Sequence, residues 1–240
     1  MTVTSLPLTA SKQTSAFATW CKQGAQLFLK SPFTLFGICL LIMIAGGMFQ
    51  ILPAPYGVIT SKLVAPLIAA IIWIVIDQVQ QHGKFSFAAF KAYSGYRKLP
   101  LLAFVLILPA VCQLLAASLI LGAQGLNLIL FGDIVGVSAM QVAMIFAAAA
   151  PAMVFTMFAP AFLLLKNTSV LDSIQNGFKI VLSAYKPMLA LTILNAIVLF
   201  AAPFTITLSV VFLGPWLACV GYVAFMQLAP QQASIERLKA

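Results

Sequence analysis

Residues 30–52 read KSPFTLFGICLLIMIAGGMFQIL, and this stretch decides the fold. Lys30 and Pro32 stand directly before about 20 mostly apolar residues, the length that a helix needs to cross a hydrocarbon core of about 30 Å. Proline is accepted in the first turn of a helix, and a cation is favoured at the water boundary of a bilayer. The same Lys/Pro pairing recurs at residues 98–100 and 186–187. We therefore expect three points at which the chain enters a membrane.

The composition supports a membrane protein. Of the 240 residues, 63% are hydrophobic and only 7% are charged, whereas a soluble domain has roughly 25% charged residues. The net charge of +9 is compatible with nucleic-acid binding in principle. The basic residues lie between apolar runs, however, and do not form one solvated cluster, so we expect no nucleic-acid partner.

Six apolar runs lie between the charges: Phe33–Leu52, Leu63–Val79, Leu101–Gly122, Ala139–Leu165, Met188–Ala202 and Thr205–Leu228. The fifth run is short, and we expect a kinked or tilted pair where it meets the sixth, near Pro203. With six spans, only Lys62 of the 13 Lys and Arg residues falls on the far side. The positive-inside rule then places both termini in the cytoplasm. The predicted fold is an all-α membrane protein with six transmembrane helices.

Each pair of spans is preceded by a segment with amphipathic spacing. In the first segment, Trp20, Gly24 and Phe28 recur every four positions. Ser86 is the expected N-cap of the second amphipathic helix, and Thr168 or Ser169 that of the third. These segments resemble cytoplasmic interfacial helices that lie in the membrane plane.

A second recurrence suggests an internal repeat. Each even-numbered span carries a proline after a small residue, at positions 66, 160 and 215. We therefore predict one membrane domain over residues 20–228, made of three hairpin units at about 20–80, 84–166 and 170–228. A polar N-terminal tail (1–19) and a cytoplasmic C-terminal tail (229–240) flank it. Residues 123–138 extend the middle unit, either as a surface connection or as a re-entrant segment.

The tail at residues 1–19 is polar and lacks the basic and apolar regions of a cleavable signal. The first span is then expected to act as an uncleaved insertion signal, which suits a bacterial cytoplasmic (inner) membrane.

Two groups of residues are candidates for function. Basic residues beside aromatic ones are expected to contact phospholipid headgroups: Lys30, Lys84, Lys91, Arg97, Lys98, Lys179 and Lys186. Gln113 and Asn195 are polar positions at membrane depth, which either hold helices together by hydrogen bonds or line a transport path. No carboxylate or histidine lies near the middle of a span, and this argues against a proton- or ion-coupled pump.

The sequence offers no enzyme signature. It has no Ser-His-Asp set, paired catalytic carboxylates, phosphate-binding glycine loop or HExxH motif. Its one histidine, His82, stands alone, and its four cysteines are scattered without metal-ligand spacing. We expect neither enzymatic activity nor a metal or cofactor.

Four motifs carry a family resemblance: Trp20-x3-Gly24-x3-Phe28-x3-Pro32, Ile51-Leu-Pro-x-Pro-Tyr-Gly57, Ala65-Pro66-Leu67 and Gly83-Lys-Phe-Ser-Phe87. Together they resemble the uncharacterised bacterial BPSS-type membrane proteins, best over residues 20–100. The three-unit plan is similar to the membrane domain of some glycerophosphodiester phosphodiesterases, although this chain has no room for their hydrolase domain. The resemblance implies a bacterial inner-membrane protein without an assigned biochemical role.

These observations favour a non-enzymatic protein that organises lipid, or another inner-membrane protein, through its basic interfacial helices. The alternative is a small permease or lipid-translocating protein. A cavity lined by Gln113 or Asn195 would favour the alternative.

Overall fold

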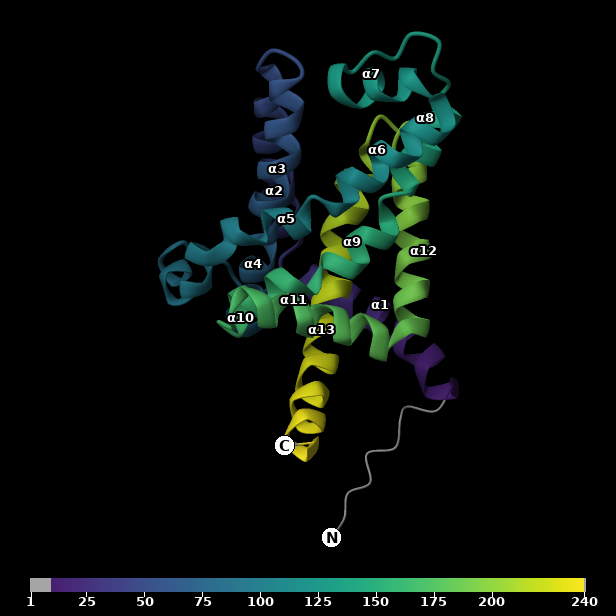
Figure 1. Cartoon of the computed structure of the whole chain (residues 1–240). Coiled ribbons are helices and arrows are strands. Elements are labelled where there is room, and N and C mark those ends of the chain that lie inside the picture. The colour runs from purple at the N-terminus through teal and green to yellow at the C-terminus, as the bar shows by residue number, and fades with distance from the viewer. Residues whose placement is uncertain (1–9, 240) are drawn as a thin grey trace.

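The structure is a computed structural model that describes residues 10–239, with side chains for residues 16–229 apart from 89 and 94 (Figure 1). Every regular element in this range is a helix. The elements are α1 (Ala10–Lys30), α2 (Pro32–Met48), η1 (Phe49–Ile51), α3 (Tyr56–Ala70), α4 (Ile72–His82), η2 (Ala88–Ala92), η3 (Ser94–Leu102), α5 (Ala103–Leu106), α6 (Leu108–Leu121), α7 (Ala123–Phe131), α8 (Ala139–Ala147), α9 (Ala150–Thr156), α10 (Phe158–Leu165), α11 (Val170–Ser183), α12 (Tyr185–Ala201) and α13 (Leu208–Lys239).

Five helical stretches in the described range are long and apolar enough to cross a membrane: Pro32–Ile51, Tyr56–His82, Gly95–Leu121, Ala139–Leu165 and Leu208–Ala229. The number rises to six if α11 and α12, which are bent by 98° at their junction, count as one span. The chain therefore has the architecture of a multi-pass helical membrane protein. α12 alone, at 17 residues, covers most of the predicted fifth span.

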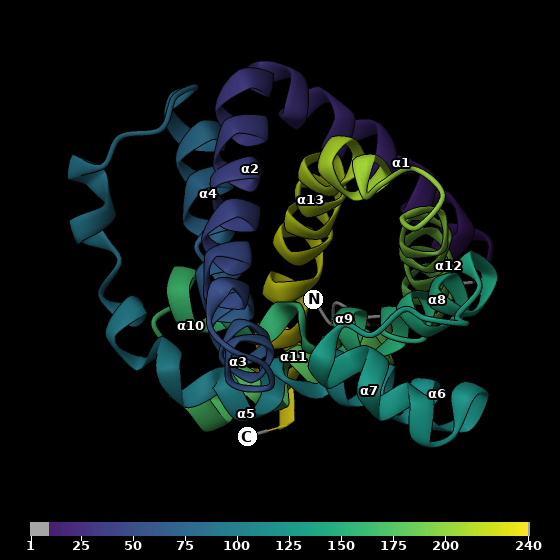
Figure 2. The same cartoon turned by 90° about the horizontal axis from the view of Figure 1, so that it is seen from above.

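The sharp bend lies one helix earlier than expected. It falls at Ala184, between α11 and α12, whereas the sequence suggested a kink near Pro203. Residues 202–207 instead form the turn from α12 to α13. α12 stands along the bundle while α11 lies across its end (Figure 1). The view from above shows α1 along the edge of the molecule, and α1 packs against α12 and α13 (Figure 2).

The three Lys/Pro pairs differ in their local structure. Pro32 is the first residue of α2, and Pro187 lies in the first turn of α12, as predicted. Pro100 is different, because it lies inside the 3-10 helix η3 and the next α-helix begins at Ala103. η3 packs against α10 so closely that a Cβ atom at Gly95 would collide with the Leu163 carbonyl oxygen. η3 is therefore a tighter helix than the α-helix expected at Pro100.

Of the two predicted helix caps, one is present and one is absent. Ser169 caps α11, and its Oγ accepts a hydrogen bond from the Asp172 amide at 3.1 Å, which confirms one of the two expected caps. The prediction for Ser86 is wrong. Phe87 occupies the N-cap position of η2, without a side-chain cap bond, and the Ser86 amide donates to Gln78 Oε1 at 2.9 Å. Ser86 is therefore tied to α4 through its backbone amide, and the segment after it forms the 3-10 helix η2 in place of the predicted amphipathic α-helix.

Both predicted tails are partly helical. α1 begins at Ala10 and α13 ends at Lys239, so the helices extend into the ranges 1–19 and 229–240. Residues 1–9 lie outside the described part of the chain. In residues 123–138, which extend the predicted middle unit, α7 packs against α6. A capping box between Ser138 and Gln141 begins α8.

The buried core is densest where α4, α10 and α13 meet. Trp73 lies 5.7 Å from Phe225 and 6.2 Å from Phe158, measured between ring centroids. Other large apolar side chains face outward, with Phe33 90% exposed and Leu119 87% exposed. Such exposure would be unfavourable in water, and in a bilayer it places these side chains among lipid chains.

Candidate functional site

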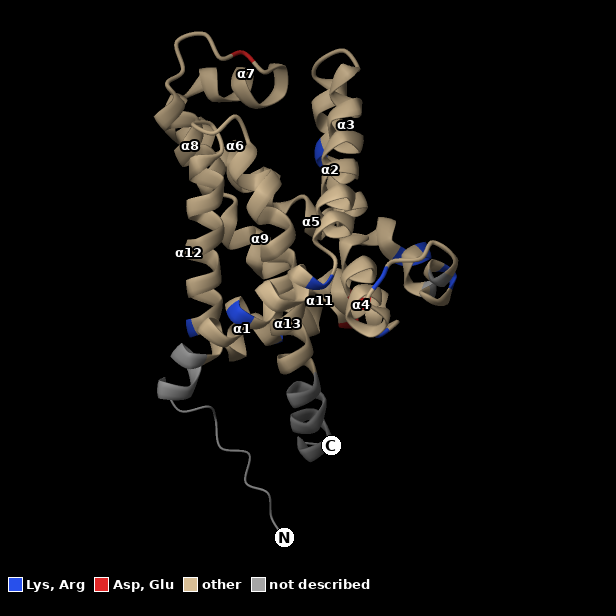
Figure 3. Ribbon diagram, turned by 180° about the vertical axis from the view of Figure 1, so that it is seen from behind, with Lys and Arg blue, Asp and Glu red and all other residues tan. Residues whose placement is uncertain are grey.

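Lys and Arg residues gather at the end of the bundle where α1, α4 and α11 lie (Figure 3). We call this the basic end. All seven residues predicted to contact headgroups are exposed. They lie on α1, α11 and α12 or on the segment from Lys84 to Lys98 that follows α4: Lys30, Lys84, Lys91, Arg97, Lys98, Lys179 and Lys186. Arg97 and Lys186 lie 6.0 Å from the ring centroids of Tyr96 and Tyr185, respectively. The structure thus pairs two of these cations with aromatic rings, a weak stabilising contact.

One of the predicted residues lines a pocket between α1, α4 and α13. Lys30 Nζ donates a hydrogen bond to Gln80 Oε1 at 2.8 Å, which joins α1 to α4. The pocket has a volume of about 410 Å³, and six of its nine lining residues have polar side chains: Gln23, Gln26, Leu27, Lys30, Gln80, Tyr222, Val223, Met226 and Gln227. We call it the glutamine pocket. Its volume lies in the range of small-ligand sites, about 300–1,000 Å³.

The position of α1 beside the glutamine pocket follows from its sequence pattern. Trp20 and Leu27 are 1% and 3% exposed, and they face the core. A Cβ atom at Gly24 would lie 2.7 Å from Val220 Cγ2, so glycine is what allows α1 to lie directly on α13. The amphipathic spacing of this segment predicted an interfacial helix, and Trp20 lies on its buried face. The Trp20 indole Nε1 donates to Gln227 Oε1 at 2.8 Å.

A buried carboxylate lies behind the pocket. Asp77 is 7% exposed, and it accepts three hydrogen bonds: from Tyr93 Oη at 2.6 Å, from Tyr222 Oη at 2.7 Å and from Gln81 Nε2 at 2.8 Å. These donors come from α4, from the joint between η2 and η3, and from α13. We call this group the Asp77 cluster. Tyr222 belongs to both sites, so the cluster fixes one wall of the glutamine pocket.

The Asp77 cluster alters the chemistry of Tyr93. Burial, the hydrogen bond to Asp77 and the negative charge of Asp77 all raise the pKa of the Tyr93 hydroxyl, in that order of importance. Tyr93 therefore stays protonated and remains a donor throughout the physiological pH range. Next to the cluster, Gln78 Nε2 is buried and has no hydrogen-bond partner in the described part of the chain.

The two predicted intramembrane polar positions have different partners. Gln113 Oε1 on α6 accepts a hydrogen bond from Lys62 Nζ on α3 at 3.1 Å. Asn195 Nδ2 donates to the Leu191 carbonyl of its own helix at 2.9 Å. Neither side chain lines the glutamine pocket. Neither lines the apolar groove of about 450 Å³ between α1, α12 and α13, which is formed by Phe17, Cys21, Ala190, Ile193, Leu194, Ile197 and Trp216.

Sequence reasoning missed the Asp77 cluster and the glutamine pocket. In the sequence, Asp77 is a single acid near the end of the second apolar run, and its partner Tyr222 lies 145 residues away. The available signal was an acid in an apolar segment, since such an acid needs donors from other helices. No three His, Cys, Asp or Glu side chains within the described residues form a group that could hold a metal ion.

Comparison of the chain with protein-family models, with curated proteins and with solved structures gave no match. The resemblance to BPSS-type membrane proteins and the similarity to the phosphodiesterase-associated membrane domain therefore stay predictions.

Proposed function

We propose that this protein is a non-enzymatic protein of the bacterial inner membrane that holds anionic phospholipid at its basic end. The observation that carries the proposal is the glutamine pocket, which places Lys30 among four glutamine side chains. The lysine has three donor hydrogens and uses one on Gln80. Two donors and a positive charge remain for a phosphate oxygen.

The depth of the pocket supports a headgroup ligand. Gln80 lies two residues before the end of the span Tyr56–His82, and Gln227 lies two residues before the end of the span Leu208–Ala229. The pocket therefore lies where two spans leave the hydrocarbon core, and phospholipid phosphates occupy that level. The exposed cations of the basic end add a field that attracts anionic lipid, with both termini on the cytoplasmic side.

The hydrogen bonds of Gln113 and Asn195 favour this role over the permease or lipid-translocating alternative. A transport path would need polar side chains that are open to a cavity. Gln113 is instead bound to Lys62, and Asn195 is bound to its own helix. Neither side chain lines the glutamine pocket or the apolar groove between α1, α12 and α13.

A lipid-binding measurement on the purified full-length chain tests the proposal. Native mass spectrometry would compare binding of dioleoyl phosphatidylglycerol to the wild type, Lys30→Gln and Lys22→Gln. Lys22 is the matched control, because it is an exposed lysine of α1 that does not line the pocket. We expect Lys30→Gln to weaken binding about fivefold, from a contribution of about 1 kcal/mol for one basic residue, and Lys22→Gln to have a smaller effect. Equal binding by Lys30→Gln and the wild type would refute the proposal.

A further inference from the structure

A second site lies away from the basic end, at Lys62. This residue is six positions after the start of the span Tyr56–His82, which is about 9 Å along the helix axis. Its side chain is only partly exposed. A lysine at this depth is unfavourable unless its ammonium group finds partners or reaches the water boundary along its aliphatic stem.

The protein supplies one partner for this ammonium group. Lys62 Nζ donates to Gln113 Oε1 at 3.1 Å. Across the described side chains, no acidic residue forms an ion pair with Lys62. Asp133, in the loop after α7, accepts a hydrogen bond from the Val135 amide within its own loop.

The pair keeps more donors than acceptors. An ammonium group has three donors and no acceptor, and a glutamine side chain has two donors on its nitrogen and an oxygen with two lone pairs. With one bond formed between Lys62 and Gln113, four donor hydrogens remain beside one lone pair. A cluster of donors with a net positive charge is complementary to an anion.

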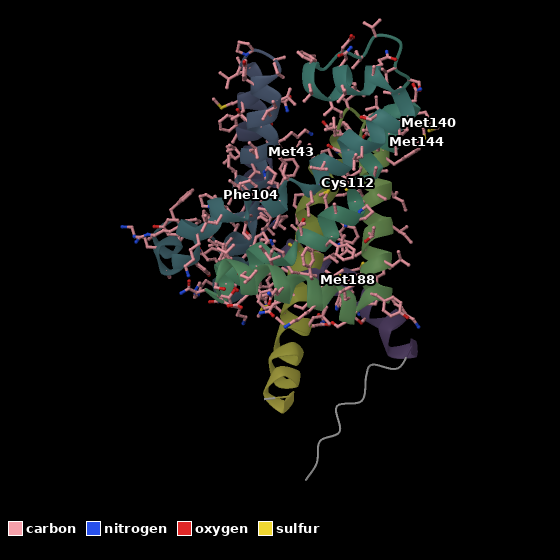
Figure 4. The ribbon with its side chains drawn as sticks, viewed as in Figure 1. Met43, Phe104, Cys112, Met140, Met144 and Met188 are labelled. Atoms are coloured by element: carbon pink, nitrogen blue, oxygen red, sulfur yellow. The ribbon has the colours of Figure 1, made fainter. Side chains whose placement is uncertain are left out.

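Exposed apolar side chains lie on α3 and on its neighbour α2. Ile59, three positions before Lys62, is 44% exposed, and Met43 on α2 is 37% exposed. In the view of Figure 4, Met43 lies on the side of the α2/α3 hairpin that faces α6, and Cys112, the neighbour of Gln113, lies on α6. Exposed apolar side chains near a cationic pair suit an amphiphile, whose chains contact them while its anionic group reaches the donors.

We propose that Lys62 and Gln113 bind the phosphate group of a phospholipid in the leaflet opposite the basic end. The inference goes beyond the proposed function, because it concerns another pair of residues and another leaflet. It does not depend on the glutamine pocket.

Native mass spectrometry of the full-length chain tests the proposal with dioleoyl phosphatidylglycerol as the probe. The variants are Lys62→Met, Lys62→Arg and Gln113→Leu. We expect Lys62→Met to weaken lipid binding about fivefold, Lys62→Arg to restore it by keeping the charge, and Gln113→Leu to give an intermediate loss. Gln113→Leu is also the safeguard if Lys62→Met does not fold.

A second arm separates a lipid phosphate from a free anion. Inorganic phosphate at millimolar concentration is added to the wild type before the lipid is titrated. We expect no displacement of lipid, because free phosphate has no acyl chains to contact the exposed apolar side chains. Lipid binding by Lys62→Met and Gln113→Leu equal to that of the wild type would overturn the proposal. Competition by inorganic phosphate would assign the site to a free anion and would overturn it too. Lys30→Gln changes the glutamine pocket alone, so its result does not decide whether Lys62 and Gln113 bind lipid.

Discussion

Asp77 and Lys62 are two charged residues on the same span, about 22 Å apart along its axis, and the protein treats them differently. Asp77 accepts three hydrogen bonds from three parts of the fold. Lys62 donates one, to a neutral amide. A buried charge with a complete set of partners holds the structure together, whereas a charge with few partners is open to a ligand. Asp77 is thus bound within the fold, and the Lys62 site is left open.

The largest effect is expected from Asp77→Ala. The change leaves two tyrosine hydroxyls and the Gln81 amide without their acceptor, so it should lower the free energy of unfolding by about 3 to 5 kcal/mol. Chemical unfolding of the purified protein in detergent, followed by circular dichroism, measures this loss.

Two controls sharpen the contrast. Asp77→Asn keeps one oxygen acceptor and should cost clearly less than Asp77→Ala. Lys62→Met removes a charge that lacks an acidic partner, so its free energy of unfolding should equal or exceed that of the wild type. If Asp77→Ala and Lys62→Met were equally destabilising, the two ends of this span would not differ in the way described.

A smaller effect is expected from Tyr93→Phe, with a defined pH dependence. Losing a hydrogen bond to a charged group should cost about 1.5 kcal/mol at pH 7. The pKa of Tyr93 is raised in the folded protein, above the value of about 10 for an unfolded chain. The stabilisation is therefore complete below about pH 10 and is lost as the pH rises further.

The difference in unfolding free energy between the wild type and Tyr93→Phe should accordingly begin to shrink above about pH 10. Measuring both proteins in parallel removes the contribution of other groups that titrate in this range. A difference that stays constant with pH would show that the Tyr93 hydroxyl does not support the fold through Asp77.

Sequence patterns predicted what depends on local hydrophobicity. The apolar runs marked the spans, because the length of an apolar segment is set by the thickness of the bilayer. The second span shows the limit of this reasoning. Its predicted start after Lys62 assumed that a charge ends the helix, but the helix starts at Tyr56 and includes Lys62, since Gln113 of another helix provides a partner. The threefold repeat stays a prediction.

Long-range contacts explain the other errors. Gly95 of η3 lies directly against α10, and the indole of the buried Trp20 donates to Gln227, which is 207 residues away. Neither contact leaves a periodic trace in the chain. The seven basic residues could be found from composition and position alone, whereas the polar partners that turn Lys30 into part of a pocket come from three separate helices.

The central claim is that the basic end and the loop after α7 lie on opposite sides of the membrane. All four native cysteines are free, so a cysteine-free background can be built to carry a single cysteine at either Lys84 or Asp133, both exposed. A membrane-impermeant maleimide would be applied to sealed vesicles of known orientation. We predict that Lys84→Cys is labelled only from the cytoplasmic face and Asp133→Cys only from the other face. Labelling of both positions from the same side would contradict the account.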